Sequence, residues 1–98
     1  MKVFSVVVGE VQGVGFRAYV ARLAQELNLA GLAKNEYGGS VQIFLDGSEK
    51  NIDKFFEIIK ATKQGRFGIR VEQVKVFRED EKGFQPPWRK YIGFEIDH

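Results

Sequence analysis

Glycines punctuate residues 9–17 (GEVQGVGFR), a stretch that joins two segments of different hydrophobic spacing. Before it, residues 2–8 (KVFSVVV) are β-branched and aromatic, which predicts a strand. After it, apolar residues recur every three or four positions over residues 16–27, which predicts an amphipathic helix ending near residue 28. Gly13 and Gly15 can adopt a positive φ without the steric penalty of a Cβ atom. These residues therefore predict a strand, a tight glycine turn and a helix.

The glycine turn has the features of a phosphate site. Its main-chain N–H groups can curl around one anion, and those at the start of the helix have no intrahelical partner. The helix dipole is positive at that end, and Arg17 adds a planar cation that can bridge two phosphate oxygens. The predicted phosphate-binding residues are Gln12, Gly13, Val14, Gly15, Phe16 and Arg17. On residue types alone, an ordinary strand-to-helix turn with a solvated Arg17 is equally compatible.

Two better-known glycine loops do not match this turn. A Walker loop continues into Gly-Lys-Ser/Thr, whereas Gly15 is followed here by Phe16 and Arg17. A dinucleotide fingerprint can place alanine third, as Ala18 is here, but 98 residues are too few for the doubly wound sheet that this motif requires. Neither architecture is therefore expected.

The composition excludes several kinds of chemistry. The chain has no cysteine, hence no disulfide, thiolate nucleophile or zinc cluster, and its single histidine disfavours Ser-His catalysis. A net charge of +2 with mixed signs is too small to favour a nucleic acid partner. The apolar run of residues 3–8 is much shorter than a signal-peptide core or a membrane span, so we expect a cytoplasmic protein without a membrane partner. Abundant lysine and glutamate are typical of thermophile proteins.

The rest of the chain predicts a second helix and four more strands. Residues 29–34 and 41–46 have strand patterns, and residues 35–39 (NEYGG) between them predict a hairpin turn. Ser48 suits the N-cap of a helix, and its predicted buried face comprises Ile52, Phe55, Phe56 and Ile59. Residues 71–76 predict the fourth strand, with a turn or bulge at Glu72-Gln73, and residues 94–96 a short closing strand.

This order predicts one α+β domain over residues 1–98, with βαββαβ order and an additional short C-terminal strand. The helices should pack on one face of an antiparallel sheet in a split βαβ arrangement. Right-handed crossovers then place Asn35 at the same rim as the glycine turn. The loop of residues 79–93 should join the last two strands at the opposite rim, so Trp88 is expected to be a packing anchor rather than a substrate contact.

Two blocks of the sequence resemble the acylphosphatase family: residues 9–17, and Lys34-Asn35 followed by Gly-Ser-Val at residues 39–41. The resemblance implies a ferredoxin-like two-layer α/β sandwich. It also implies an enzyme, without metal or cofactor, that hydrolyses the carboxyl-phosphate bond of acyl phosphates to carboxylate and inorganic phosphate. Its catalytic residues would be Arg17, which binds phosphate, and Asn35, which orients the attacking water. Inorganic phosphate, the product, should compete with the substrate.

Three segments depart from the family pattern. Residues 36–38 (EYG) put the Glu36 carboxylate beside the anion site, where it could lower affinity. Residues 66–68 replace a small, proline-containing turn, and the loop with Pro86-Pro87-Trp88 is longer than in the family pattern. None of these changes involves the two catalytic candidates, so they should affect substrate range or stability.

Two other functions of this topology stay open. Residues 65–71 (GRFGIRV) mimic the aromatic motif of RNA-recognition domains, but they follow the second helix instead of lying on the third strand. A non-catalytic domain that binds phosphate or another small ligand is the second alternative, and the presence of both Arg17 and Asn35 disfavours it. The acyl group is undetermined, and Arg66 and Phe67 are candidate contacts for it.

Overall fold

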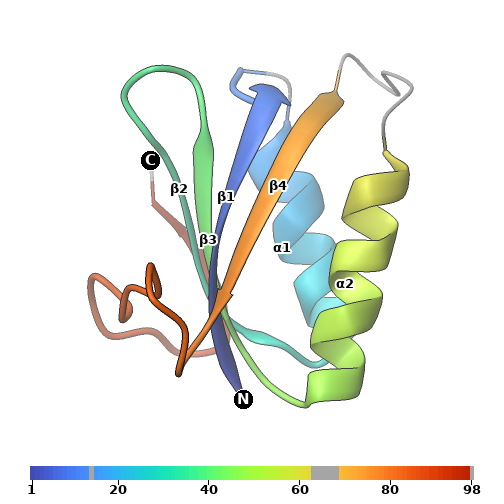
Figure 1. Cartoon of the computed structure of the whole chain (residues 1–98). Helices are drawn as coiled ribbons and strands as arrows, with labels where there is room; N and C mark the ends of the chain where they lie inside the picture. Colours follow the sequence, from blue (N-terminus) through green and yellow to red (C-terminus); the bar gives the residue numbers. More distant parts are fainter. Residues whose placement is uncertain (14, 63–68, 98) are drawn as a thin grey trace.

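The computed structural model describes residues 1–13, 15–62 and 69–97. Two helices lie on one face of a five-stranded sheet, and the loop of residues 79–93 lies on the other face (Figure 1). The elements are β1 (Lys2–Glu10), α1 (Phe16–Glu26), β2 (Ala30–Asn35), β3 (Val41–Asp46), α2 (Glu49–Ala61), β4 (Arg70–Arg78) and β5 (Phe94–Asp97). The predicted order of helices and strands is confirmed, with boundaries shifted by a residue or two.

The sheet has the strand order β4-β1-β3-β2-β5. Its first four strands pair antiparallel, but β5 pairs parallel with β2, from Gly31 opposite Phe94 to Lys34 opposite Asp97. The expectation of an antiparallel sheet is therefore wrong for this strand. The reason is topological: β5 starts at the end of the sheet where β4 finishes, and it joins the edge beside β2, which runs in the same direction.

The helix ends follow local sequence signals. The Ser48 hydroxyl accepts a hydrogen bond of 3.1 Å from the Asn51 main-chain N–H, which confirms the predicted N-cap of α2. After α1, Asn28 has a φ of 55°, a left-handed conformation that asparagine tolerates. The chain turns there into β2.

Both faces of the sheet are covered by apolar side chains. The main core lies under the helices, where Val20 and Leu23 of α1 and Phe55 and Ile59 of α2 are buried. On the other face, the buried residues Phe4, Leu32 and Phe44 form a second layer. The Phe44 ring lies 6.3 Å from that of Phe84 and 5.7 Å from that of Tyr91, between ring centroids. The loop of residues 79–93 therefore acts as a cover for this second apolar layer.

A β-bulge lies near the start of β4, as the irregular step in the sequence predicted. Val8 is opposite Gln73 and Gly9 is opposite Val71, so Glu72 is the extra residue. Bulges increase local twist and bend the strands that contain them. This one lies directly before the glycine turn that follows β1.

Candidate active site

The glycine turn connects β1 to α1 at one end of the sheet. Gly13 and Gly15 have φ values of 72° and 78°, and a Cβ atom at either position would meet open space. Glycine is therefore favoured here by backbone conformation and not by crowding. Gly15 is the N-cap of α1, and within the described residues no side chain caps this helix. Its first main-chain N–H groups, which include those of Phe16 and Arg17, have no partner within the helix. Val14, predicted to bind phosphate with them, lies outside the described residues.

Arg17 lies in the first turn of α1, and its side chain is half-buried. Its Nη1 donates a hydrogen bond to the main-chain carbonyl of Asp97, the last residue of β5. A guanidinium has five N–H donors in one plane, so this bond leaves others for a ligand. Arg17 lines a cleft of about 160 Å³, together with Val11, Gly13, Gly15, Phe16, Ala18 and Ile96. A cleft of this size suits a group as small as a phosphate.

Gln12 ties the glycine turn to the β2–β3 hairpin. Its Nε2 donates hydrogen bonds to the main-chain carbonyls of Glu36 at 2.7 Å and Ser40 at 2.8 Å. The side chain is therefore engaged with the hairpin, and any contact of Gln12 with phosphate would come from its main chain. No local pattern in the sequence predicted this tether, because its partners are main-chain atoms.

Asn35 is the last residue of β2 and is exposed. It lies opposite Val41 of β3, which lies opposite Val7 of β1, so Asn35 and the end of β1 share one end of the sheet. The predicted position of Asn35 at the rim of the glycine turn is confirmed.

The Glu36 carboxylate, which lies at this rim, is paired with a lysine of the same hairpin. The Lys34 Nζ lies 3.6 Å from a carboxylate oxygen of Glu36, and both side chains are about one third exposed. An ion pair of this kind offsets the negative charge that Glu36 would otherwise present to an anion.

Trp88 lies closer to this site than the sequence predicted. The loop of residues 79–93 does start and end at the opposite rim, but the Trp88 Nε1 donates a 2.6 Å hydrogen bond to a carboxylate oxygen of Asp97. The Lys34 Nζ also lies 4.5 Å from the centre of the Trp88 ring. The loop crosses the second face of the sheet and so brings Trp88, predicted to be a packing anchor rather than a substrate contact, beside Asp97 and Lys34.

The carboxylates of β5 are held in their ionised form. Hydrogen bonds from Arg89 and then Trp88 lower the pKa of Asp97. The main-chain N–H of Ile92 and then the Arg89 side chain lower the pKa of Glu95. The contacts that hold Asp97 are therefore intact at neutral pH.

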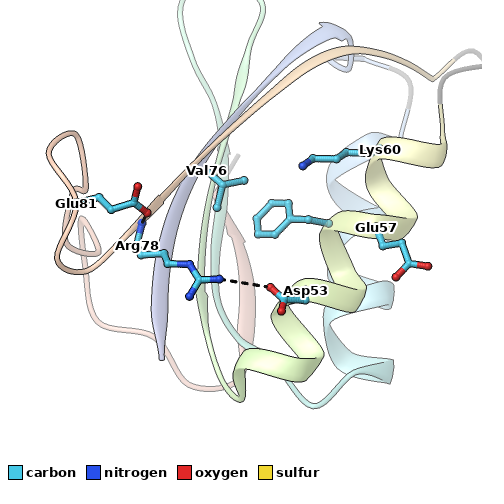
Figure 2. A pocket seen from close by; sticks show the side chains of 7 residues that line it. Asp53, Glu57, Lys60, Val76, Arg78 and Glu81 are labelled. Atoms are coloured by element: carbon cyan, nitrogen blue, oxygen red, sulfur yellow. Dashed lines mark hydrogen bonds and ion pairs between the residues drawn. The ribbon is translucent and has the colours of Figure 1, made fainter.

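A second cavity, of about 380 Å³, lies between α2 and β4 (Figure 2). Two basic side chains, Lys60 and Arg78, line it together with the carboxylates of Asp53, Glu57 and Glu81. Arg78 lies 2.9 Å from the carboxylate of Glu49 and 3.8 Å from that of Asp53. Because carboxylates outnumber the basic side chains in this lining, the cavity is poorly suited to an anion, and none of the described predicted site residues lines it.

The described residues contain neither a candidate metal cluster nor a candidate membrane-spanning helix. Residues 1–13, 15–62 and 69–97 contain no group of three or more His, Cys, Asp or Glu side chains that could hold a metal ion. In the same ranges, no helix is both long enough and apolar enough to cross a membrane.

Known proteins resemble this chain in sequence and in fold. A family model described as acylphosphatase matches residues 3–96. The acylphosphatase of Vibrio vulnificus is 41% identical over 91 residues, 93% of this chain and 90% of that protein. The acylphosphatase structure from Bacillus subtilis has a TM-score of 0.76 at 30% identity and covers 99% of this chain and 98% of its own. Full-length HypF, in a phosphate- and nucleotide-bound form, has a TM-score of 0.73 at 28% identity, covering 99% of this chain and 12% of that one.

The fold and the cleft define a small α+β sandwich of ferredoxin-like topology with a glycine turn suited to an anion. The chain belongs to the acylphosphatase family. The resemblance found in residues 9–17 and 34–41 is thus confirmed, together with the function it implied, the enzymatic hydrolysis of acyl phosphates. The RNA-binding and non-catalytic alternatives are not favoured.

Proposed function

We propose that the turn of residues 12–17 holds the phosphoryl group of an acyl phosphate and that Asn35 orients the water that hydrolyses it. One observation carries this proposal: Arg17 lines a phosphate-sized cleft beside Gly13 and Gly15, with one guanidinium nitrogen tied to the Asp97 carbonyl. A cation that is already oriented loses little freedom when it binds phosphate.

The proposed reaction is a displacement at phosphorus. The water oxygen attacks phosphorus, the bond to the acyl oxygen breaks, and its electron pair leaves with the carboxylate. The proton of the attacking water passes to a phosphate oxygen, so the products are a carboxylate and inorganic phosphate. Because a carboxylate is a good leaving group, the reaction does not need a general acid on the protein.

Positioning and electrostatic stabilisation are the main contributions that a protein makes to phosphoryl transfer. In our proposal, Arg17 and the main-chain N–H groups of the turn stabilise the charge on the equatorial phosphate oxygens. The Asn35 carboxamide accepts a hydrogen bond from the water. This bond orients the water so that a lone pair of the water oxygen faces phosphorus. Asn35 is exposed and lies at the same end of the sheet as the turn, and both observations support this role.

Hydrolysis of benzoyl phosphate, followed by its loss of absorbance, tests the function directly. We expect turnover by the purified protein and competitive inhibition by inorganic phosphate, as both ligands would occupy the same turn. The phosphate-bound form of HypF supports this choice of competitor. A protein that binds phosphate but leaves benzoyl phosphate intact would overturn the catalytic part of the proposal.

We also propose a cytoplasmic location, one domain over residues 1–98, and a substrate range that includes small acyl phosphates such as acetyl, carbamoyl and glyceroyl phosphates. The absence of cysteine and the mixed surface charge support the first of these. The match of the family model to residues 3–96 supports the second. Thermophilic origin stays a prediction from the lysine and glutamate content. Arg66 and Phe67, proposed acyl contacts, lie outside the described residues.

A further inference from the structure

The loop of residues 79–93 holds β5 through the carboxylates of Glu95 and Asp97, and Asp97 is the one at the end of the strand. One carboxylate oxygen of Asp97 accepts the 2.6 Å hydrogen bond from the Trp88 Nε1. The other accepts a hydrogen bond from the Arg89 Nε at 2.8 Å and lies 2.6 Å from its Nη2. Charge-assisted hydrogen bonds with this two-sided geometry restrict the carboxylate strongly. Asp97 is thus held by two consecutive residues of the loop.

Asp97 also contacts the candidate site, through a different atom. Its main-chain carbonyl accepts the hydrogen bond from the Arg17 Nη1. Asp97 ends a strand of four residues at the edge of the sheet, and this strand pairs only with β2 among the described strands. The ends of short edge strands fray unless other contacts hold them. The position of the carbonyl therefore depends on the contacts of the Asp97 side chain as well as on pairing with Lys34 of β2.

We infer that Trp88 is a positioning residue for Arg17: by holding the Asp97 side chain, it fixes the carbonyl that orients the guanidinium. Because the guanidinium is planar, fixing one nitrogen restricts the plane in which the others face the cleft. This inference rests on the proposed role of Arg17 in phosphate binding. It also gives the longer loop a function beyond covering the second apolar layer.

Trp88 makes two kinds of contact, and a conservative substitution separates them. Its indole N–H binds Asp97, while its ring lies under the Lys34 ammonium. Trp88→Phe removes the donor and keeps an aromatic ring for packing and for the cation. Loss of one such hydrogen bond weakens the restraint on Asp97, and we expect phosphate inhibition to weaken roughly threefold to tenfold.

The same loop offers a matched control. The Tyr91 hydroxyl donates a 2.6 Å hydrogen bond to the Asp46 carboxylate. Asp46 lies opposite Lys2 and Ala30, at the end of the sheet away from Asn35. Tyr91→Phe therefore removes one loop hydrogen bond of similar length without touching Asp97. A structural role alone predicts equal effects of the two substitutions on thermal unfolding and none on phosphate inhibition.

The experiment measures the inhibition constant of inorganic phosphate and the KM and kcat for benzoyl phosphate in the wild type and in both variants. We expect Trp88→Phe to raise the inhibition constant and KM while Tyr91→Phe leaves them unchanged. In an Arg17→Ala background, Trp88→Phe should have no further effect, because the residue that it positions is gone. If Trp88→Phe folds poorly, Asp97→Ala provides a second variant, since it removes both side-chain contacts and keeps the main-chain carbonyl.

The outcomes separate this inference from the function on which it rests. If Arg17→Ala leaves phosphate inhibition unchanged, the proposed role of Arg17 fails and the inference fails with it. If Arg17→Ala weakens inhibition but Trp88→Phe behaves like Tyr91→Phe, the function stands and the positioning role of Trp88 is overturned. An equal effect of Trp88→Phe with and without Arg17 would also overturn that role.

Discussion

The side-chain amide of Gln12 donates a 2.7 Å hydrogen bond to the main-chain carbonyl of Glu36, which joins the glycine turn to the hairpin that follows Asn35. The same nitrogen reaches the Ser40 carbonyl at 2.8 Å. Two segments that carry the proposed phosphate-binding and water-orienting groups are thereby connected by one side chain.

Gln12→Leu should loosen the connection between the turn and the hairpin. The substitution removes the side-chain donor from two carbonyls that keep main-chain donors, from Gly39 and from Glu36, so we expect a cost on the order of 1 kcal/mol. We expect urea unfolding to shift to lower concentration and KM for benzoyl phosphate to rise. Gln12→Glu, which keeps the shape but offers an acceptor to the carbonyls, should behave similarly; full activity and stability in both variants would contradict the proposed connection.

Arg17→Ala should raise KM and lower kcat for benzoyl phosphate. Loss of a charge-assisted bidentate contact costs on the order of 1.5–3 kcal/mol. Arg17→Lys should also be poor, because an ammonium is a point charge and does not reproduce the planar fork. Steady-state kinetics of the two variants check this, and wild-type behaviour of the lysine variant would argue against bidentate binding.

Asn35→Ala should lower kcat by ~10²-fold while the inhibition constant of inorganic phosphate stays close to the wild-type value. The reason is that Asn35 is proposed to contact the water and not the phosphoryl group. Parallel measurement of turnover and phosphate inhibition separates these effects. Unchanged turnover in a purified, folded variant would remove the proposed role.

Tyr91 should make stability fall at alkaline pH. Burial, and then the hydrogen bond to Asp46, raise the pKa of Tyr91 to about 12, against about 10 for an unperturbed tyrosine. On raising the pH, the unfolded chain loses this proton first, so the contribution to stability is full below about pH 10 and is lost between about pH 10 and 12. Urea unfolding at pH 8 and pH 11, in the wild type and Tyr91→Phe, should show a smaller loss in the variant.

Ser48→Ala should destabilise the protein without affecting the site. Ser48 caps α2 through the Asn51 N–H, and removing such a cap costs about 1 kcal/mol. We expect a lower urea midpoint with an unchanged slope and unchanged KM. A large change in KM would show that the end of α2 communicates with the glycine turn.

Local signals predicted most of the fold. The spacing of apolar residues predicted both helices, and the glycines of the hairpin and of the 9–17 turn marked where the chain reverses. Ser48 and the bulge at Glu72 were found for the same reason: each is a feature of a few adjacent residues. The right-handedness of the crossover connections then predicted that Asn35 lies at the same end of the sheet as the glycine turn, without any knowledge of contacts.

The amino-acid sequence by itself determined the elements, their order and the two residues proposed to act on phosphate. Only the tertiary structure decided that β5 pairs parallel with β2, that Asp97 thereby meets Arg17, and that Trp88 reaches Asp97 from the loop. The physical reason is that these contacts join residues far apart in the chain. An apolar run predicts a strand but not the edge that it joins, and a hydrogen bond between residues 80 positions apart leaves no periodic pattern in the sequence.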